Sequence, residues 1–360
     1  MRAEVVASIQ ELKDIKEQWN KLLEGSISNS IFLTWEWAYS WAECFINEKR
    51  ELFVVKVYDD GNRLVGIAPW YKSAIKVGPS FMRQISFIGT PETASDYLDV
   101  FTTRGREREV SNYLYDYLFG EASNSWDCVN FQDTRAESLF LLSFMHKHRL
   151  QGRYLEISQG SFCPIISLPQ NEEEFLSRIS SSRSKRFRQD LRTLKKTDEV
   201  EIKTYVTEGI EEAVDSFFKL YAEKTEWEGK DLHRFMKRLV ANSETGKFLQ
   251  IDYLLANKNT IGGLLHLRNN DTLSLYLMAV DKTYNPRISA GNLLVGLCIL
   301  RAIESQFKIY DFLKGYEDYK FYWTNEGRTT QTVCIVQRRA LPVIYMMKKM
   351  TKNALKTMLR

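Results

Sequence analysis

The stretch from Asp271 to Trp323 constrains the fold of this chain most strongly, because strand-forming and helix-forming patterns alternate within it. Its first apolar run predicts a strand buried on both faces, and a later segment has apolar side chains at helical spacing. This order predicts an α/β unit in which a helix connects two strands. The predicted elements are a strand over 273–280, a polar loop over 281–291, a helix over 292–305, a strand over 308–313 and an aromatic, charged segment over 316–323.

The loop before the predicted helix has the composition of an anion site. A helix N-terminus carries a partial positive charge and N–H groups without partners, so phosphates bind there. Three small residues would let a pyrophosphate approach the backbone, and an arginine adds a full positive charge. The alternative is an ordinary strand-to-helix turn with a serine N-cap and no ligand. The candidate cofactor-binding residues are Arg287, Ile288, Ser289, Ala290, Gly291 and Asn292.

A longer motif follows the loop, with the spacing Asp-Phe-x-x-Gly-x-x-x-Tyr-Lys-x-x-Trp. Its residues are Asp311, Phe312, Gly315, Tyr319, Lys320 and Trp323. With the loop, this motif resembles the CelD/BcsL-like acyltransferases of the GNAT superfamily, which are related to the Fem peptidyltransferases. That family usually has Pro-Gly in the turn where this chain has Ala290 and Gly291. The resemblance covers most of the chain and implies a mixed-sheet α/β protein with tandem GNAT folds.

The resemblance also implies a chemistry, the transfer of an acyl group from acetyl-CoA or another acyl-CoA to an amine without a metal. In such relatives two parallel strands splay and the thioester lies in the gap; here these would be strands 273–280 and 308–313. Lys320 is the candidate for holding the developing negative charge, and Tyr319 for protonating the leaving thiolate. Alternatively, both side chains are structural and pack under the sheet. No residue stands out as the general base.

Length and composition place these elements in a two-domain protein of ordinary solubility. The chain has 360 residues, and its formal net charge of +4 gives no reason to expect a DNA partner. The 5 cysteines are scattered without metal-site spacing, which favours reduced thiols in a cytoplasmic protein. No run approaches the roughly 20 apolar residues of a membrane span.

A repeated order of strands and helices predicts one domain over 1–165 and a second over 166–337, followed by a basic helix over 338–360. A segment rich in Gly, Ser and Pro, 158–172, marks the boundary. The first half has no small-residue loop before its corresponding helix, where 102–108 reads Thr-Thr-Arg-Gly-Arg-Glu-Arg. We therefore interpret this half as a degenerate copy that shapes the acceptor site.

Four residues are candidates for binding the acceptor. Asp96 and Tyr97 end a loop of Gly, Pro, Ser and Thr, a composition that suits recognition of a sugar or an amine, although an Asp that caps a turn would look the same. Trp35 lies off the apolar stripe of the Trp-rich helix predicted over 32–45, so it could line a ligand rather than pack in the core. The fourth candidate is Tyr276, in the strand predicted over 273–280.

Two basic segments have open roles. Residues 180–196 contain seven basic side chains and one acid, which could meet the phosphates of a nucleotide-linked substrate or form a solvated face. After Glu326 no acid occurs, and the helix predicted over 338–360 is amphipathic and basic, so it could dock on its own domain or on an anionic membrane. The lone strand histidine, His266, is expected to be a satisfied core residue.

Three functions fit these features. The first, which we expect, is an acyl-CoA-dependent N-acyltransferase acting on the amino group of a sugar, nucleotide-sugar or related envelope or exopolysaccharide precursor. The second is a Fem-type peptidyltransferase that uses aminoacyl-tRNA, although the long helical arm of many Fem enzymes is not evident. The third is a non-catalytic accessory protein of polysaccharide synthesis. The expected location is the cytoplasm, with the C-terminal helix as a candidate contact to the inner face of the membrane.

Overall fold

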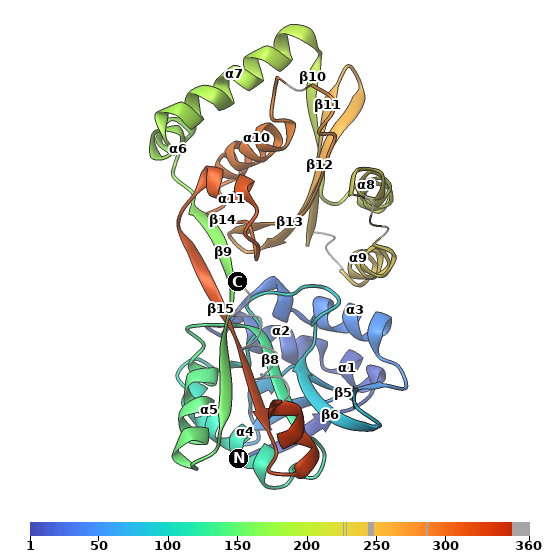
Figure 1. Cartoon of the computed structure of the whole chain (residues 1–360), viewed down its shortest axis with the longest axis vertical. Helices are drawn as coiled ribbons and strands as arrows, with labels where there is room; N and C mark the ends of the chain where they lie inside the picture. The colour runs from blue at the N-terminus through green and yellow to red at the C-terminus, as the bar shows by residue number, and fades with distance from the viewer. Residues whose placement is uncertain (226, 228, 244–247, 286, 348–360) are drawn as a thin grey trace. The chain divides into compact units, whose positions relative to one another are not determined.

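The structure is a computed structural model that describes all residues except 226, 228, 244–247, 286 and 348–360. The chain divides into two compact units, the first formed by Met1–Gly160 with Thr330–Arg360 and the second by Ser161–Thr329. Figure 1 shows the elements of both units. Two long strands, β9 (Leu155–Ser167) and β15 (Gly327–Val336), carry the chain from one unit to the other.

The first unit contains two sheets, the helices α1 to α5 and the helical residues 340–347. Its other strands are β1 (Arg2–Val6), β2 (Arg50–Leu52), β3 (Val54–Tyr58), β4 (Leu64–Ala68), β5 (Trp70–Val77), β6 (Ser80–Phe87), β7 (Phe101–Thr102) and β8 (Cys128–Arg135). Its helices are α1 (Ile9–Asp14), α2 (Lys16–Glu24), α3 (Trp35–Phe45), α4 (Glu107–Phe119) and α5 (Leu139–Leu150). One sheet has the order β1-β3-β4-β7, and the other runs β15-β8-β6-β5-β2 with β6 and β8 parallel.

The second unit is one sheet with helices on both faces. Its strands are β10 (Val200–Tyr205), β11 (Leu249–Ala256), β12 (Asn259–Asn269), β13 (Thr272–Val280) and β14 (Ile309–Asp311). Its helices are α6 (Glu172–Arg178), α7 (Ser181–Thr197), α8 (Ile210–Thr225), α9 (Lys230–Asn242), α10 (Ala290–Glu304) and α11 (Asp318–Trp323). The order is β10-β11-β12-β13-β14-β9, in which only β13 and β14 are parallel. Helices α8 and α9 lie on one face, and α7 and α10 lie on the other (Figure 1).

The same topology occurs once in each unit. An antiparallel pair, β5–β6 or β12–β13, leads into a helical crossover to a parallel neighbour, β8 or β14. Strand β9 follows the first repeat in the sequence but pairs antiparallel with β14 of the second repeat. Strand β15 follows the second repeat but pairs antiparallel with β8 of the first. This exchange explains why the compact units differ from the predicted ranges 1–165 and 166–337: residues 330–336 belong to the sheet of the first unit.

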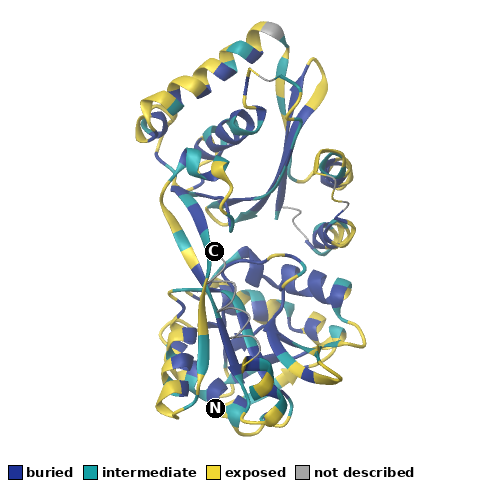
Figure 2. Ribbon diagram, in the orientation of Figure 1, coloured by how far each residue is buried: buried dark blue, intermediate teal, exposed yellow. Residues whose placement is uncertain are grey.

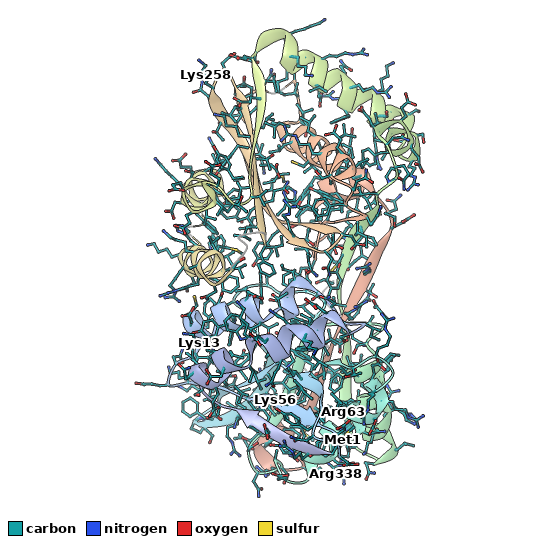
Figure 3. All side chains as sticks on the ribbon, turned by 180° about the vertical axis from the view of Figure 1, so that it is seen from behind. Met1, Lys13, Lys56, Arg63, Lys258 and Arg338 are labelled. Carbon is teal, nitrogen blue, oxygen red and sulfur yellow. The ribbon has the colours of Figure 1, made fainter. Side chains whose placement is uncertain are left out.

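Local sequence accounts for most element boundaries. Ser8 and Glu11 form a reciprocal capping box at the start of α1, and Ile15 separates α1 from α2. The Thr34 hydroxyl accepts from the Trp37 N–H at 3.3 Å and so begins α3. Lys258, in the tight turn between β11 and β12, has a positive φ of 68° (Figure 3).

Each unit has its own apolar core, visible as the dark blue strands and helix faces in Figure 2. In the first unit five tryptophans are fully buried: Trp19, Trp37, Trp41, Trp70 and Trp126. In the second, α10 lies at the centre of the core and carries Gly296, where a Cβ would collide with the rings of Phe187 and Trp323. The missing side chain therefore lets α7 and α11 pack directly against α10.

The described part of the C-terminal segment docks on the first unit. Residues 340–347 are helical, and Met346 is buried against Met82, Cys128 and Cys334. The basic residues from Lys348 onward, on which the predicted amphipathic helix depends, lie outside the described residues. Within the described residues, no helix has both the length and the apolar character needed to cross a bilayer.

Candidate active site

The two parallel strands of the second unit part soon after they meet. Their register covers three residue pairs, from Thr272 opposite Ile309 to Ser274 opposite Asp311. At Asp311 β14 ends, whereas β13 continues to Val280. The strands therefore have the splay that was predicted for 273–280 and 308–313, although only three residues of the second segment are strand.

A β-bulge lies next to this parting. Along the β12–β13 register Leu265 is opposite Leu277, whereas His266 is opposite Leu275, so Tyr276 is one extra residue on β13. A bulge bends its strand and redirects the side chain and backbone of the extra residue. Tyr276 is partly buried and lies two residues beyond Ser274, where the pairing with β14 ends. The sequence indicated this tyrosine but contained no sign of the bulge.

The loop before α10 is held by a residue of another helix, α7. Helix α10 begins at Ala290, two residues earlier than predicted, and Ser289 occupies the N-cap position without a capping bond from its side chain. Instead, the Ser289 N–H donates to the Asp190 carboxylate of α7 at 3.2 Å. Ile288 is buried and Arg287 is exposed. The turn therefore does not use the serine side-chain cap that the alternative interpretation required.

Gly291 is not required by the packing of the protein. Its φ is not positive, and the nearest atom to an added Cβ would be the Met278 sulfur at 3.5 Å, an ordinary contact. Asn292 follows, with a side-chain oxygen that is buried and has no hydrogen-bond partner among the described residues. The backbone at the start of α10 therefore has space beside Gly291, where the sequence predicted that a phosphate binds.

The signature motif builds the turn that follows β14. The Asp311 carboxylate accepts from the Leu313 N–H at 2.7 Å. Gly315 has a φ of 133°, and an added Cβ there would collide with Glu317 and Lys320. Such a conformation is open to glycine and strained for other residues, which explains this glycine in the motif.

Lys320 is buried inside the same turn. Its side chain is 4% exposed, and Nζ donates to the Lys314 carbonyl at 2.6 Å and the Leu313 carbonyl at 3.4 Å. The ammonium also lies 3.0 Å from the Glu317 carboxylate. All three oxygens belong to the segment between β14 and α11, so in this structure the ammonium ties that segment together.

Tyr319 lies beside it, at the edge of the core. Its ring meets Phe312 in an edge-on contact, with centroids 6.3 Å apart. Burial raises the pKa of the Tyr319 hydroxyl above its usual range, and the nearby Glu317 charge adds to this shift. The phenol is therefore protonated at neutral pH and able to donate.

The comparisons with known proteins decide the class of this unit. Residues 181–321 match the family model described as "Acetyltransferase (GNAT) domain". These residues form a GNAT acetyltransferase domain. The predicted fold class and the expected GNAT-type N-acyltransferase are thereby confirmed, whereas the narrower resemblance to the CelD/BcsL-like proteins stays a prediction. No curated protein matches the sequence.

Solved structures similar to the whole chain agree on the fold. A conserved protein of unknown function from Bacteroides thetaiotaomicron has a TM-score of 0.58 at 10% identity, covering 93% of this chain and all of the other. FemX has a TM-score of 0.59 at 10% identity, with 92% and 97% covered. L-PGS from Bacillus licheniformis has a TM-score of 0.54 at 10% identity, with 92% and 94% covered. At such identities the likeness concerns the fold alone.

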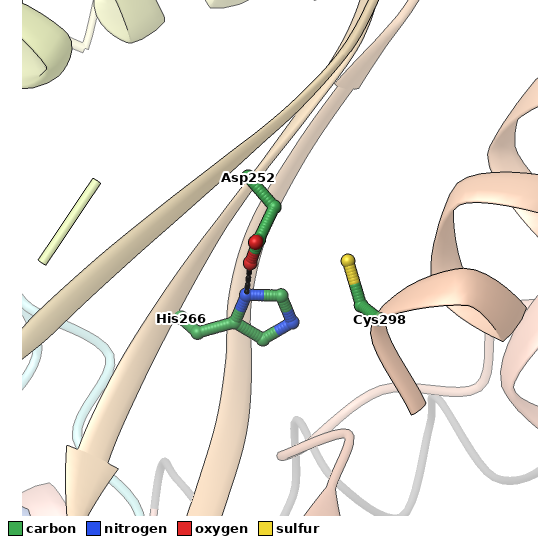
Figure 4. Close-up of side chains that lie close together, drawn as sticks. All are labelled: Asp252, His266 and Cys298. Carbon is green, nitrogen blue, oxygen red and sulfur yellow. Dashed lines mark ion pairs between the residues drawn. The ribbon is translucent and has the colours of Figure 1, made fainter. Parts of the chain in front are cut away.

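The GNAT domain also contains a buried polar network that the sequence analysis did not identify (Figure 4). His266 Nε2 lies 2.8 Å from the Tyr310 hydroxyl, and Nδ1 lies 3.0 Å from the Asp252 carboxylate. The two oxygens of Asp252 also accept from Thr204 at 2.6 Å and from Gln250 at 2.8 Å. His266 is thus buried and paired, as expected for a core histidine. A signal was present, since Asp252 is an acid within a strand-like segment of mainly apolar residues, 249–256.

Cys298 of α10 completes this cluster. One ligand-type atom from each of Asp252, His266 and Cys298 lies within 4.8 Å of the others, a grouping that could hold a metal ion. Burial opposes ionisation of Asp252, but the contact with His266 and its other hydrogen bonds lower its pKa. Burial raises the pKa of the Cys298 thiol well above its usual value, so the thiol stays protonated. Because Asp252 already has donors on both oxygens, the cluster fits a hydrogen-bond network that joins β11, β12, β14 and α10.

The remaining candidates lie in the first unit. Trp35 is buried, donates its indole N–H to the Leu12 carbonyl at 2.7 Å and stacks on Tyr39 at 4.5 Å, so it packs in the core. Asp96 is fully buried, and Tyr97 is buried with a φ of 57°. These three belong to a different compact unit from Tyr276, Tyr319, Lys320 and the 287–292 loop.

A polar pocket of about 480 Å³ lies beside the loop that leads to Asp96. Thr90 and Pro91 of that loop form part of its wall, and an asparagine in the wall has a buried side-chain oxygen without a hydrogen-bond partner among the described residues. The sequence did not reveal this pocket, because its walls come from segments far apart in the chain. Its other polar lining residues include Asn47, Arg50, Tyr71, Ser86, Asn130 and Gln132.

Proposed function

We propose that this protein transfers an acyl group from acetyl-CoA or another acyl-CoA to the amino group of a sugar, nucleotide-sugar or related envelope or exopolysaccharide precursor. One observation carries the proposal: β13 and β14 part directly after Ser274 and Asp311, and the 287–292 loop begins α10 at the far end of β13. A thioester between the splayed strands and a pyrophosphate at the helix N-terminus would use both features.

In this proposal the acceptor amine attacks the thioester carbonyl and forms a tetrahedral oxyanion. The oxyanion needs preorganised donors, and the thiolate that leaves needs a proton. Tyr319 supports the second role, because its partly buried phenol has a raised pKa and stays protonated. Lys320 is the candidate for the first, for which its ammonium would exchange one of its present oxygen partners for the oxyanion. Water remains the candidate for deprotonating the amine.

The choice of acceptor class is supported by the polar pocket of the first unit. Its amide, hydroxyl and guanidinium groups are of the kind that hydrogen-bond sugar hydroxyls, and Asn130 and Arg50 are among them. Asp96 and Tyr97 lie in the same unit and stay candidates for acceptor binding. We propose a cytoplasmic enzyme whose C-terminal basic residues touch the inner face of the membrane.

A second candidate is the transfer of an aminoacyl group from aminoacyl-tRNA. One observation favours it: α7 carries exposed Lys185, Arg188 and Arg192 along one side, over a groove with α6. Rows of basic side chains attract the phosphates of RNA. The proteins named FemX and L-PGS share the fold, which is compatible with either donor.

The test measures release of free CoA thiol from acetyl-CoA with a panel of amino sugars and nucleotide-linked amino sugars. The proposal expects thiol release that depends on one member of the panel, together with CoA binding detected by calorimetry. Binding of charged tRNA without binding of CoA would favour the second candidate. Binding of neither donor by folded protein would favour a non-catalytic accessory role.

A further inference from the structure

Helix α7 contacts the cofactor loop through two charged side chains one turn apart. Arg186 donates from its guanidinium to the Arg287 carbonyl at 2.7 Å, and Asp190 accepts the Ser289 N–H at 3.2 Å. The two side chains also pair with each other at 2.8 Å. Helix α7 lies outside the strand–helix–strand segment β13–α10–β14 and precedes β10 in the sequence. It therefore contacts the loop from a second side.

Packing fixes α7 in this position. Phe187, between the two charged residues, is buried against α10, where Gly296 leaves space for its ring. Arg183, one turn earlier, donates to the Tyr322 carbonyl at 2.9 Å, and the Tyr322 hydroxyl donates back to the Arg183 carbonyl at 2.8 Å. The loop, α7 and α11 are therefore held as one body around the start of α10.

Asp190 occupies the position of an anion at this helix terminus. Its side chain is 6% exposed, and its carboxylate receives the first backbone N–H of the turn. Carboxylates and phosphates use the same donors at a helix N-terminus, and both are attracted by the helix dipole. A phosphate that binds here is therefore repelled by the negative charge of Asp190 unless that carboxylate moves away from the Ser289 N–H.

Arg186 can pair either with the Asp190 carboxylate or with a phosphate. Its side chain is 52% exposed, although its guanidinium already bridges Asp190 and the loop. Arginine has five N–H donors in a planar fork and binds phosphate in a bidentate manner. Arg186 and Asp190 both contact the loop that begins α10, and the exposed Arg287 belongs to the same loop.

We propose that Arg186 and Asp190 form an exchangeable ion pair, in which the pyrophosphate of the acyl donor displaces the Asp190 carboxylate from the α10 N-terminus and takes over Arg186. Arg186 then contacts the donor phosphate, and Asp190 holds the loop in shape while it is empty. This inference rests on the proposed acyl-CoA function and adds a specificity for phosphate-bearing donors. It also explains why a buried acid occurs in an otherwise basic helix.

The experiment is calorimetric titration of the full-length protein with CoA, at one ionic strength, for four proteins. Asp190→Asn keeps the shape and an acceptor oxygen but removes the competing charge, so the Kd for CoA should fall about threefold to tenfold. Arg186→Gln removes the phosphate partner and should raise that Kd about tenfold or more. Lys219→Gln is the control, because this exposed lysine of α8 lies on the opposite face of the sheet and should leave the Kd within about twofold of the wild-type value.

Pantetheine, which lacks phosphates, is the second ligand. Neither Asp190→Asn nor Arg186→Gln should change its binding, whereas a general loss of fold would weaken both ligands and lower the Tm. Weaker CoA binding by Asp190→Asn, or an Arg186→Gln protein that behaves like Lys219→Gln, would overturn the exchange while the acyl-CoA function stands. If the folded wild-type protein binds neither ligand, the acyl-CoA function fails and the exchange fails with it.

Discussion

The Lys320 ammonium has two candidate roles, one catalytic and one structural. The resemblance implied a catalytic ammonium, and the structure places that ammonium among three protein oxygens in the turn after β14. A buried amine with such partners stabilises the turn, and truncating it leaves the oxygens without their donor. Tyr319 is not tied in the same way and meets Phe312 through its ring. The two residues should therefore respond differently to substitution.

We expect Tyr319→Phe to lower turnover by about 10²-fold with an unchanged Kd for CoA, because only the proton donor is lost. Lys320→Met keeps the stem and removes the charge, so we expect a loss of stability of about 1–3 kcal/mol from the unpaired carbonyls. Turnover and thermal unfolding are measured on both proteins. A Lys320→Met protein that keeps its Tm but loses about 10²–10³-fold in turnover would assign the ammonium to the oxyanion instead.

Asp99 offers a test of buried charge in the first unit. Burial raises the pKa of its carboxyl to about 6, against hydrogen bonds from Ser138 and Ser28 that favour the charged form. The folded state thus binds a proton more tightly than the unfolded state, so the stability linked to this group is present below about pH 4 and lost as the pH rises through about 6.

Asp99→Asn should remove this pH dependence. The difference in free energy of unfolding between variant and wild type should change by about 2 kcal/mol in favour of the variant between pH 4 and pH 7. Urea unfolding of both proteins at several pH values measures this difference. A constant difference across that range would show that Asp99 titrates alike in the folded and unfolded states.

At the scale of elements, α10 is the part on which the proposed site depends. Its N-terminus faces the loop and its middle carries Gly296, against which Phe187 and Trp323 pack. Cys298 lies on the same helix and meets the His266 network. One helix thereby joins the cofactor loop, the end of the signature motif and the buried polar cluster, so changes in its packing should reach all three.

Gly291→Val tests the backbone approach at this helix. An added side chain would find only ordinary contacts with Met278 and Val280, so the fold should tolerate it. A pyrophosphate should not, and we expect the Kd for CoA to rise more than tenfold, about 1.4 kcal/mol or more. Gly291→Ala is the smaller control and should have an intermediate effect. Unchanged CoA affinity in a folded Gly291→Val protein would place the phosphates elsewhere.

At the scale of the whole molecule, the exchange of last strands links the two repeats. Residues 330–336 of β15 pair with β8, and Ile165, Ile166 and Ser167 of β9 pair with β14. A chain that ends at Thr329 should therefore lose the stability of its first unit, whereas one that ends at Gln337 keeps β15 and loses only the docked helix. Thermal unfolding and limited proteolysis of both truncated proteins distinguish the cases. Equal stability would mean that β15 contributes little to the first unit.

The C-terminal basic residues lead to a separate prediction about location. Deleting Lys348–Arg360 removes five of the eight basic residues that follow Glu326. Each basic side chain near an anionic bilayer contributes about 1 kcal/mol. We expect the intact protein to co-sediment with anionic vesicles at moderate salt, and the shortened protein to stay in solution. Absence of sedimentation by the intact protein would contradict a membrane role.

The sequence by itself determined the elements and the class of fold. The strand–loop–helix stretch, the Thr34 cap and the turn at Gly315 follow from side chains a few residues apart, because periodicity, capping and backbone strain act locally. The candidate loop at 287–292 was therefore visible before the structure, whereas the splay of the two strands was implied only by the resemblance to GNAT relatives. The bulge at Tyr276 was not, since it depends on the register with a neighbouring strand.

Only the tertiary structure decided which distant segments meet. Asp190 lies 99 residues before Ser289, and His266 lies 44 residues before Tyr310, yet each pair is in hydrogen-bond contact. The exchange of β9 and β15 is of the same kind, because many apolar strands could pair with β8 or β14. Such choices are made by burial of the whole core and satisfaction of its polar groups at once. No single stretch of sequence contains that information.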